Sequence, residues 1–221
     1  MSIIWQARQL LFDGVLVTIS LTLAAGLVTV IMSFAAGIAC LSRNAIVRAV
    51  AIVYVELFRG VSLLVQLFWL FFVLPFFGVR LDPYTTAIIG LGLCNGAYGA
   101  EIVRAGILAV PRGQFEASTA LNYTRFQRFR RIILPQAVPL ILPPFSNLAI
   151  ELLKATSLVS LITIQDLSFQ AMTLRQTTMR TVEPFLTILV IYFLLAQALT
   201  MFFRMLEQRF DPAALRKGAR R

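Results

Sequence analysis

Two pairs of oppositely charged side chains interrupt long apolar stretches of this 221-residue sequence. Glu151 and Lys154 form one pair, and the hydroxyl-bearing Thr156 and Ser157 follow within the next helical turn. Residues three positions apart lie on the same face of a helix, so the two charges can partly neutralise each other. Within a membrane, where one charge costs roughly 3 kcal/mol, such groups face a protein interior or a wet cavity. They could therefore line a path for a zwitterionic solute, with Gln66 as a further candidate, or simply join two helices.

Glu101 and Arg104 have the same spacing but lie near the end of their apolar stretch, so we expect a structural role for this second pair. The sequence has no histidine, which excludes Ser-His and Cys-His catalysis and histidine metal sites. Cys40 and Cys94 lie in separate apolar stretches without metal-ligand spacing, and the phosphate-binding pattern G-x-x-x-x-G-K-[ST] is absent. We therefore expect no catalytic residue, no metal and no cofactor bound by this chain.

The apolar stretches around these residues are long enough to cross a membrane. Hydrophobic residues make up 59% of the chain and charged residues 14%, whereas a soluble domain carries about 25% charged residues. A helix needs about 20 apolar residues to span a bilayer. The sequence therefore predicts an all-α membrane protein, a single transmembrane domain with five spans at residues 14–41, 49–78, 83–110, 136–162 and 184–206.

Basic residues predict the orientation of these spans. Arginine-rich segments follow the first, third and fifth spans, whereas the segments 79–82 and 163–183 are nearly neutral. Because basic loops stay in the cytoplasm, the amino terminus is predicted outside and the carboxyl terminus inside. The net charge of +10 then serves orientation and contact with membrane lipid, and we expect no nucleic-acid partner. In the outer segment, Thr163 and Asp166 have capping-box spacing, which predicts a short helix starting at Thr163.

A polar, basic segment at 111–135 joins the third and fourth spans. Its first part predicts a short helix that stops at Asn122, because asparagine adopts the left-handed conformation more readily than other non-glycine residues. Thr124 and Gln127 have the spacing of a capping box that starts a second helix, and Pro135 is predicted to end that helix. The apolar face of the second helix is predicted to carry Phe126, Phe129 and Ile133. The segment would form a compact cytoplasmic knob, with a plain interfacial loop as the alternative.

Four blocks of sequence resemble the permease subunits of binding-protein-dependent ABC importers. The signature loop of that family reads E-A-A, three residues, G, nine residues, I-x-L-P. This chain matches it at Glu116, Ala117, Ile132, Leu134 and Pro135. It departs from it at Ser118, where alanine is usual, and at Asn122, where glycine is usual. The blocks at 56–68, 97–107 and 152–162 resemble the polar amino acid branch, which usually has proline at the position of Ser62.

The resemblance implies a transport subunit with no enzymatic centre, in the bacterial inner membrane. In that family the loop docks in a cleft of the cytoplasmic ATPase and transmits its closure. This implies a coupling role for Gly113, Glu116, Ala117, Ser118, Leu121, Asn122 and Pro135. The implied partners are a dimer of ABC ATPases that binds ATP and Mg, a second identical or similar permease subunit, and an extracytoplasmic solute-binding protein.

The branch resemblance also implies the substrate class, a polar amino acid or a similar small zwitterion moved by alternating access. Opines and ectoine-type compatible solutes belong to the same chemical range. An independent secondary transporter or channel is the alternative function, although five spans without an inverted repeat fit it poorly.

Overall fold

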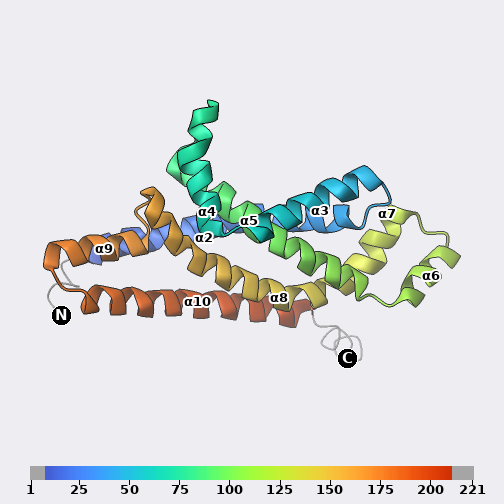
Figure 1. The fold of residues 1–221 in the computed structure, drawn as a ribbon. Helices are drawn as coiled ribbons and strands as arrows, with labels where there is room; N and C mark the ends of the chain where they lie inside the picture. Colours follow the sequence, from blue (N-terminus) through green and yellow to red (C-terminus); the bar gives the residue numbers. More distant parts are fainter. Residues whose placement is uncertain (1–7, 211–221) are drawn as a thin grey trace.

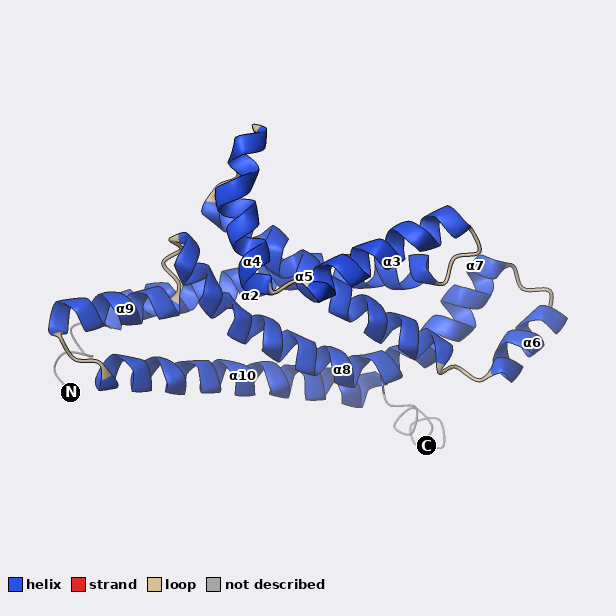
Figure 2. Cartoon of the chain, in the orientation of Figure 1, coloured by secondary structure: helices blue, strands red, loops and turns tan. Residues whose placement is uncertain are grey.

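The computed structural model describes residues 8–210, and within this range the chain forms helices and connecting loops but no strand (Figure 1, Figure 2). The long helices are α2 (Arg8–Cys40), α5 (Pro83–Leu108), α8 (Leu134–Ala155) and α10 (Val182–Phe210). The shorter α-helices are α3 (Ala45–Gly60), α4 (Leu63–Phe68), α6 (Arg112–Ala120), α7 (Arg125–Arg128) and α9 (Leu167–Thr178). Two π-helical turns, η1 (Trp69–Val73) and η3 (Phe129–Ile133), and two 3-10 segments, η2 (Leu74–Phe77) and η4 (Thr156–Ile162), complete the path.

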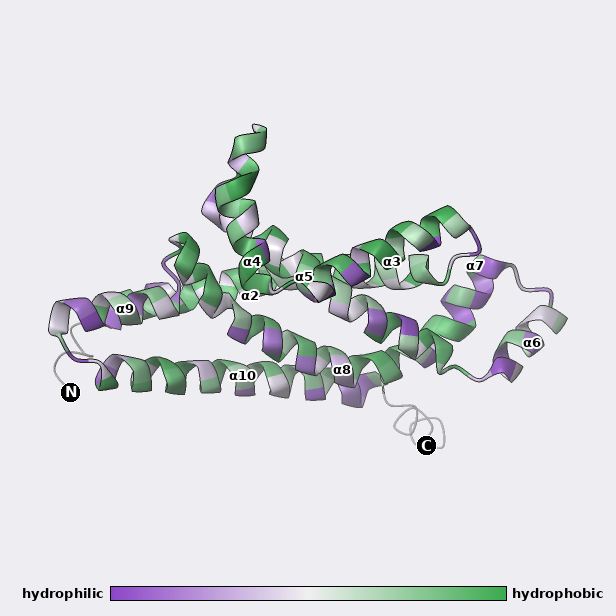
Figure 3. Ribbon diagram, viewed as in Figure 1, coloured by the Kyte–Doolittle hydropathy of each residue, from purple (hydrophilic) through white to green (hydrophobic). Residues whose placement is uncertain are grey.

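The number of membrane spans agrees with the sequence-based prediction. Four stretches are long and apolar enough to cross a membrane: α2, α5, α10 and the continuous run Arg125–Ile162. A fifth is present when α3 and the segment Leu63–Phe77 are taken together as one broken span. Figure 3 shows hydrophobic residues along the long helices, while hydrophilic residues gather at α7 and α9, at opposite ends of the molecule. The structure is therefore an all-α membrane protein.

The second predicted span is not one straight helix. The chain bends by 103° between α3 and the segment that begins at Leu63. Val61 at the bend is extended, with φ −112° and ψ 140°. The side-chain amide of Gln66 donates to the backbone carbonyls of Phe58 and Val61, each over 2.9 Å. These bonds satisfy carbonyl groups that lose their helical partners at a break, so the bend forms with serine at position 62 and needs no proline.

Helices α2 and α5 pack closely because small residues face each other. A β-carbon at Gly37 of α2 would lie 2.7 Å from the carbonyl oxygen of Ala100 on α5. A β-carbon at Gly99 would collide with the hydroxyl of Ser33, which donates to the carbonyl of Thr29 over 2.6 Å. Small residues let helix backbones approach in a membrane, where water-driven burial does not operate between helices. This seam places α5 at the centre of the subunit (Figure 1).

Pro135 does not end a helix, which corrects the sequence-based prediction. Helical structure continues from α7 through η3 into α8, and Pro135 occupies the first turn of α8. The preceding residue, Leu134, donates its N–H to the carbonyl of Phe129, five residues back. This wider turn accommodates a residue that lacks an N–H and crowds the preceding carbonyls. The extra residue in this turn also shifts the side of the helix on which later residues lie. Ile133 is buried, whereas Phe126, predicted on the same face, is 69% exposed.

The segment at 163–183, which the sequence analysis places outside, contains α9, and this helix begins after Asp166 rather than at Thr163 as predicted. Asp166 is completely buried and its carboxylate accepts from the N–H groups of Ser168 and Phe169 over 3.1 and 3.0 Å. The Tyr192 hydroxyl of α10 also donates to this carboxylate over 3.3 Å. Burial raises the pKa of Asp166 above its ordinary value, against the opposing effect of these hydrogen bonds. Thr163 instead adopts a left-handed conformation with φ 69°.

Candidate coupling helix and polar cleft

The outer face of α6 has no partner within the described chain. Gly113, Glu116 and Ala117 are exposed on it, at spacings of three and four residues that put them on one side of the helix. A β-carbon at Gly113 would meet no atom of the described residues within 4 Å. Leu121, which follows the helix, is 68% exposed. Four of the residues predicted to couple the chain to an ATPase therefore lie on an accessible surface at one end of the molecule (Figure 1).

The opposite face of α6 is attached to the bundle. Ser118 is completely buried, and its hydroxyl donates to the carbonyl of Phe115 over 2.6 Å. Phe115 packs against the buried cluster that contains Ile133 of η3 and Ile107 of α5. The internal hydrogen bond satisfies the hydroxyl of Ser118, which explains how serine replaces the usual alanine at a position without solvent access.

Asn122 closes α6 in the predicted left-handed conformation, with φ 56°. Its N–H donates to the carbonyl of Thr119 over 2.9 Å, and the N–H of Tyr123 donates to the carbonyl of Ser118 over 3.1 Å. The next helix starts with the predicted capping box. In it, Gln127 and Thr124 exchange side-chain and backbone hydrogen bonds of 3.0 and 3.3 Å. The direction of α6 is thus fixed by local backbone bonds on both sides of the turn.

A second site is an open polar cleft of about 330 Å³ beside the bend after α3. It receives Glu151 from α8, Arg59 from the last turn of α3, and Tyr98 from α5. The Arg59 guanidinium lies over the Tyr98 ring, 5.5 Å from its centre. The Tyr98 hydroxyl donates to the backbone carbonyl of Arg59 over 3.5 Å. The cleft is therefore lined by an arginine, a carboxylate and the residues of the bend.

The other residues predicted for a translocation path are not collected at this cleft. Lys154 is exposed and forms no ion pair with Glu151 in the described chain, so the predicted mutual neutralisation does not occur. Thr156 is completely buried, and its hydroxyl donates to a backbone carbonyl of its own helix over 2.7 Å. Ser157 likewise donates to the carbonyl of Lys154 over 2.8 Å. Gln66 holds the bend through both hydrogens of its amide.

Arg59 and Tyr98 are among the cleft residues that sequence reasoning did not assign to a path. Arg59 falls near a predicted membrane boundary, where an anchoring role is the ordinary interpretation. Arg59 lies in the last turn of α3, and the packing of α3 against α5 brings it beside Tyr98, just before the chain turns by 103°. The interrupted apolar run at Gly60–Ser62 is the one signal in the sequence that could have indicated such a turn.

Glu101 and Arg104 form the ion pair that their spacing predicts. The Arg104 Nη2 and Nε atoms donate to Glu101 Oε2 over 2.6 and 3.1 Å. Their side chains are 31% and 41% exposed, respectively, and both belong to α5. The pair therefore neutralises charge within one helix rather than joining two, and its structural role remains a prediction.

Comparisons with known proteins agree with this architecture. Residues 29–212 match the family described as "Binding-protein-dependent transport system inner membrane component". A relative from Sinorhizobium fredii, named "Probable amino-acid ABC transporter permease protein y4tF", is 48% identical and the match covers 88% of this chain and 84% of the relative. The "Glutamine transport system permease protein GlnP" of Escherichia coli is 35% identical, with 94% and 96% covered.

Solved structures show the same fold. The structure titled "Crystal structure of an amino acid ABC transporter with histidines" matches with a TM-score of 0.86 and 34% identity, over 93% of this chain and 96% of that one. A structure of the MetNI methionine ABC transporter matches with a TM-score of 0.80 at 20% identity, which supports the fold alone. The family match covers most of the chain, and the relatives are alike along nearly their whole length. The chain belongs to the inner-membrane component family of binding-protein-dependent transport systems, whose members here are permease subunits of ABC importers.

Proposed function

We propose that this chain is the membrane subunit of an ATP-driven importer that takes up a polar amino acid or a similar small zwitterion. The observation that carries the proposal is α6, a short helix whose attached face packs on the bundle while its other face is exposed. The exposed face is held in a fixed direction by the attached face and by the turn at Asn122, as a surface that binds another protein would be. The named relatives support the substrate class, because their names specify amino acids and glutamine.

The partner at α6 is proposed to be a cytoplasmic ABC ATPase, which binds ATP and Mg and hydrolyses the ATP. Two ATPases and two permease subunits, identical or similar, would form the complete importer. The orientation supports this assignment. The loop between α2 and α3, the helices α6 and α7, and the carboxyl end of α10 lie at one end of the molecule (Figure 1). All three segments are basic, as expected of cytoplasmic segments. The end that carries α9 then faces the extracytoplasmic solute-binding protein.

The cleft beside the bend is proposed as part of the solute path. A zwitterion carries a carboxylate that Arg59 could bind in a bidentate manner and an ammonium group that Glu151 could bind. In this assignment Glu151 lines the solute path, as the sequence-based prediction has it, and Arg59 takes the place of Lys154 as the basic residue of the path. The cleft is open on one side in the single subunit, and a second permease subunit would close the path during alternating access.

Reconstitution in liposomes tests the proposal. The chain is incorporated with its ATPase and binding protein, and uptake of labelled amino acids is measured with and without ATP. We expect uptake only when all partners and ATP are present, and no uptake by the chain alone under a proton or sodium gradient. Gradient-driven uptake by the chain alone would refute the proposal and favour an independent secondary transporter. Calorimetric titration of the binding protein with single amino acids would then identify the solute.

A further inference from the structure

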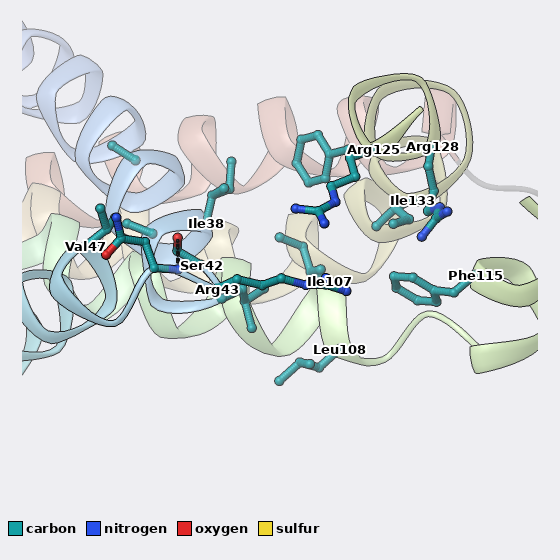
Figure 4. Close-up of a pocket in the computed structure, with 15 residues that line it drawn as sticks. Ile38, Ser42, Arg43, Val47, Ile107, Leu108, Phe115, Arg125, Arg128 and Ile133 are labelled. Atoms are coloured by element: carbon teal, nitrogen blue, oxygen red, sulfur yellow. Dashed lines mark hydrogen bonds between the residues drawn. The ribbon is translucent and has the colours of Figure 1, made fainter. Parts of the chain in front are cut away.

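A large cleft of about 830 Å³ lies at the same end of the molecule as α6, away from the polar cleft described above. It is bounded by the end of α2 with the loop to α3, by the end of α5, and by α6, α7 and η3 (Figure 4). None of the residues that line it has been assigned to the solute path.

Three arginines supply the charge of this cleft. Arg43, Arg125 and Arg128 line it, and none of the lining residues in the described part of the chain is acidic. Figure 4 shows their side chains extending from two sides, Arg43 from the α2–α3 loop and the other two from α7. The Nε atom of Arg128 is buried and has no hydrogen-bond partner among residues 8–210. Such a group is costly to leave unsatisfied, and a buried donor near two further guanidinium groups indicates an anionic partner.

The remaining wall of the cleft is mostly apolar. It is formed largely by aliphatic and aromatic side chains, namely Ile38, Val47, Ile107, Leu108, Phe115 and Ile133. Ile38, Val47 and Leu108 are 39%, 43% and 60% exposed in the subunit. These residues lie where α2 and α5 leave the predicted membrane core and where the chain returns into it through η3. An anion that enters this cleft would therefore have hydrocarbon beside it.

We propose that the cleft binds one anionic phospholipid of the cytoplasmic leaflet. Its phosphodiester would lie among the three arginines, and its acyl chains would follow the apolar wall towards the bilayer. Free inorganic phosphate would use the charges but not the wall, and a soluble acidic protein would have to reach the depth at which the spans end. Basic pockets between membrane helices on the cytoplasmic side are known to recognise lipid headgroups in this way. The inference rests on the proposed orientation, with α6 in the cytoplasm.

The bound lipid would also steady the coupling helix. Phe115 of α6 lines the cleft, and Arg125 and Arg128 belong to the helix that follows the turn at Asn122. A lipid bridging these residues to Arg43 would connect α6 and α7 to the end of α2. The position of α6 would then depend on the lipid composition of the membrane.

Native mass spectrometry of the full chain tests this proposal without requiring transport. The chain is released from nanodiscs that contain phosphatidylglycerol and phosphatidylcholine, and the bound lipid is identified. We expect one retained phosphatidylglycerol. The double variant Arg125→Gln/Arg128→Gln should bind it roughly 25-fold more weakly, about fivefold for each basic side chain near an anionic surface. The matched double variant Arg130→Gln/Arg131→Gln removes the same charge from exposed neighbours outside the cleft and should change binding by less than about twofold.

Two further variants separate specific binding from simple charge. Ala39→Trp fills the apolar part of the cleft with all three arginines present, and it should also lose the lipid. Arg43 lies in an exposed loop, so Arg43→Gln tests lipid binding in the cleft even if the double variant does not fold. Equal loss of lipid binding in both double variants would overturn the proposal. Displacement of the lipid by about 20 mM inorganic phosphate, a concentration well above that needed to screen weak ionic contacts, would also overturn it. Retention of the lipid by all variants would overturn it too. So would the finding that the ATPase, rather than lipid, covers the three arginines.

If uptake fails in liposomes while lipid retention follows these expectations, the proposed function fails and the lipid site stands. If uptake succeeds while lipid is retained equally by every variant, the lipid site fails and the proposed function stands. The two proposals can therefore be judged separately.

Discussion

Replacement of Asn122 by valine should weaken the docking of the ATPase. Asn122 has φ 56°, and two backbone hydrogen bonds close the turn around it. The left-handed conformation costs an ordinary L-residue roughly 1–2 kcal/mol, and a β-branched side chain lies at the upper end of that range. If α6 must hold this turn to dock, the dissociation constant of the ATPase should rise by about 5- to 30-fold.

The assay is the affinity of the purified ATPase for the chain in nanodiscs, measured by surface plasmon resonance, together with ATP-driven uptake in liposomes. Asn122→Gly should bind the ATPase at least as tightly as the natural chain, since glycine adopts this conformation without strain. Met179→Val provides a matched control, because Met179 is also left-handed, with φ 54°, but follows α9 at the opposite end. It should lose comparable stability and keep the ATPase affinity. Unchanged affinity of Asn122→Val would refute the role of the turn.

Four further predictions follow from single positions. Glu116→Lys, on the exposed face of α6, should insert normally and lose both ATPase association and uptake, measured by co-purification and liposome transport. Gly37→Ala should destabilise the chain by about 1–3 kcal/mol and so lower its unfolding temperature in detergent, because the new β-carbon would lie 2.7 Å from a backbone oxygen. Gly113→Ala, the control, should leave the unfolding temperature unchanged. Gln66→Leu should cost about 1–3 kcal/mol in the same assay, because two carbonyls at the bend lose their donor. Burial raises the pKa of Asp166 above 3.8, so the folded chain binds its proton more tightly than the unfolded chain. Stability should therefore rise as the pH falls through the raised pKa towards 3.8, and Asp166→Asn should remove that dependence in thermal unfolding at several pH values.

Features that depend on a few neighbouring residues could be predicted from the sequence. The stop at Asn122 and the capping box of Thr124 and Gln127 formed as expected, because both are closed by backbone groups within five residues. The ion pair of Glu101 and Arg104 is equally local. The five apolar stretches were predicted for a similar reason, since span length depends on local composition alone.

Features that depend on other elements could not be predicted in this way. The bend at Val61 depends on the amide of Gln66 and on the packing of α5 against the break, and no turn residue other than Gly60 precedes it. The π-helical turn before Pro135 moves the apolar face by one residue, which a regular helical period does not anticipate. Spacing within one helix predicts that Glu151 pairs with Lys154. In the fold, Glu151 instead shares a cleft with Arg59 from α3.

If the proposed ATPases bind α6, the two faces of this helix would transmit their movement to the proposed solute path. Phe115 connects the attached face to a buried cluster that contains Ile107 of α5 and Phe145 of α8. The same two helices carry Tyr98 and Glu151 into the polar cleft. Tight packing transmits displacement because it has few voids to absorb it. A force on the exposed face of α6 would therefore shift the ends of α5 and α8, and the cleft between them and Arg59 would change shape with it.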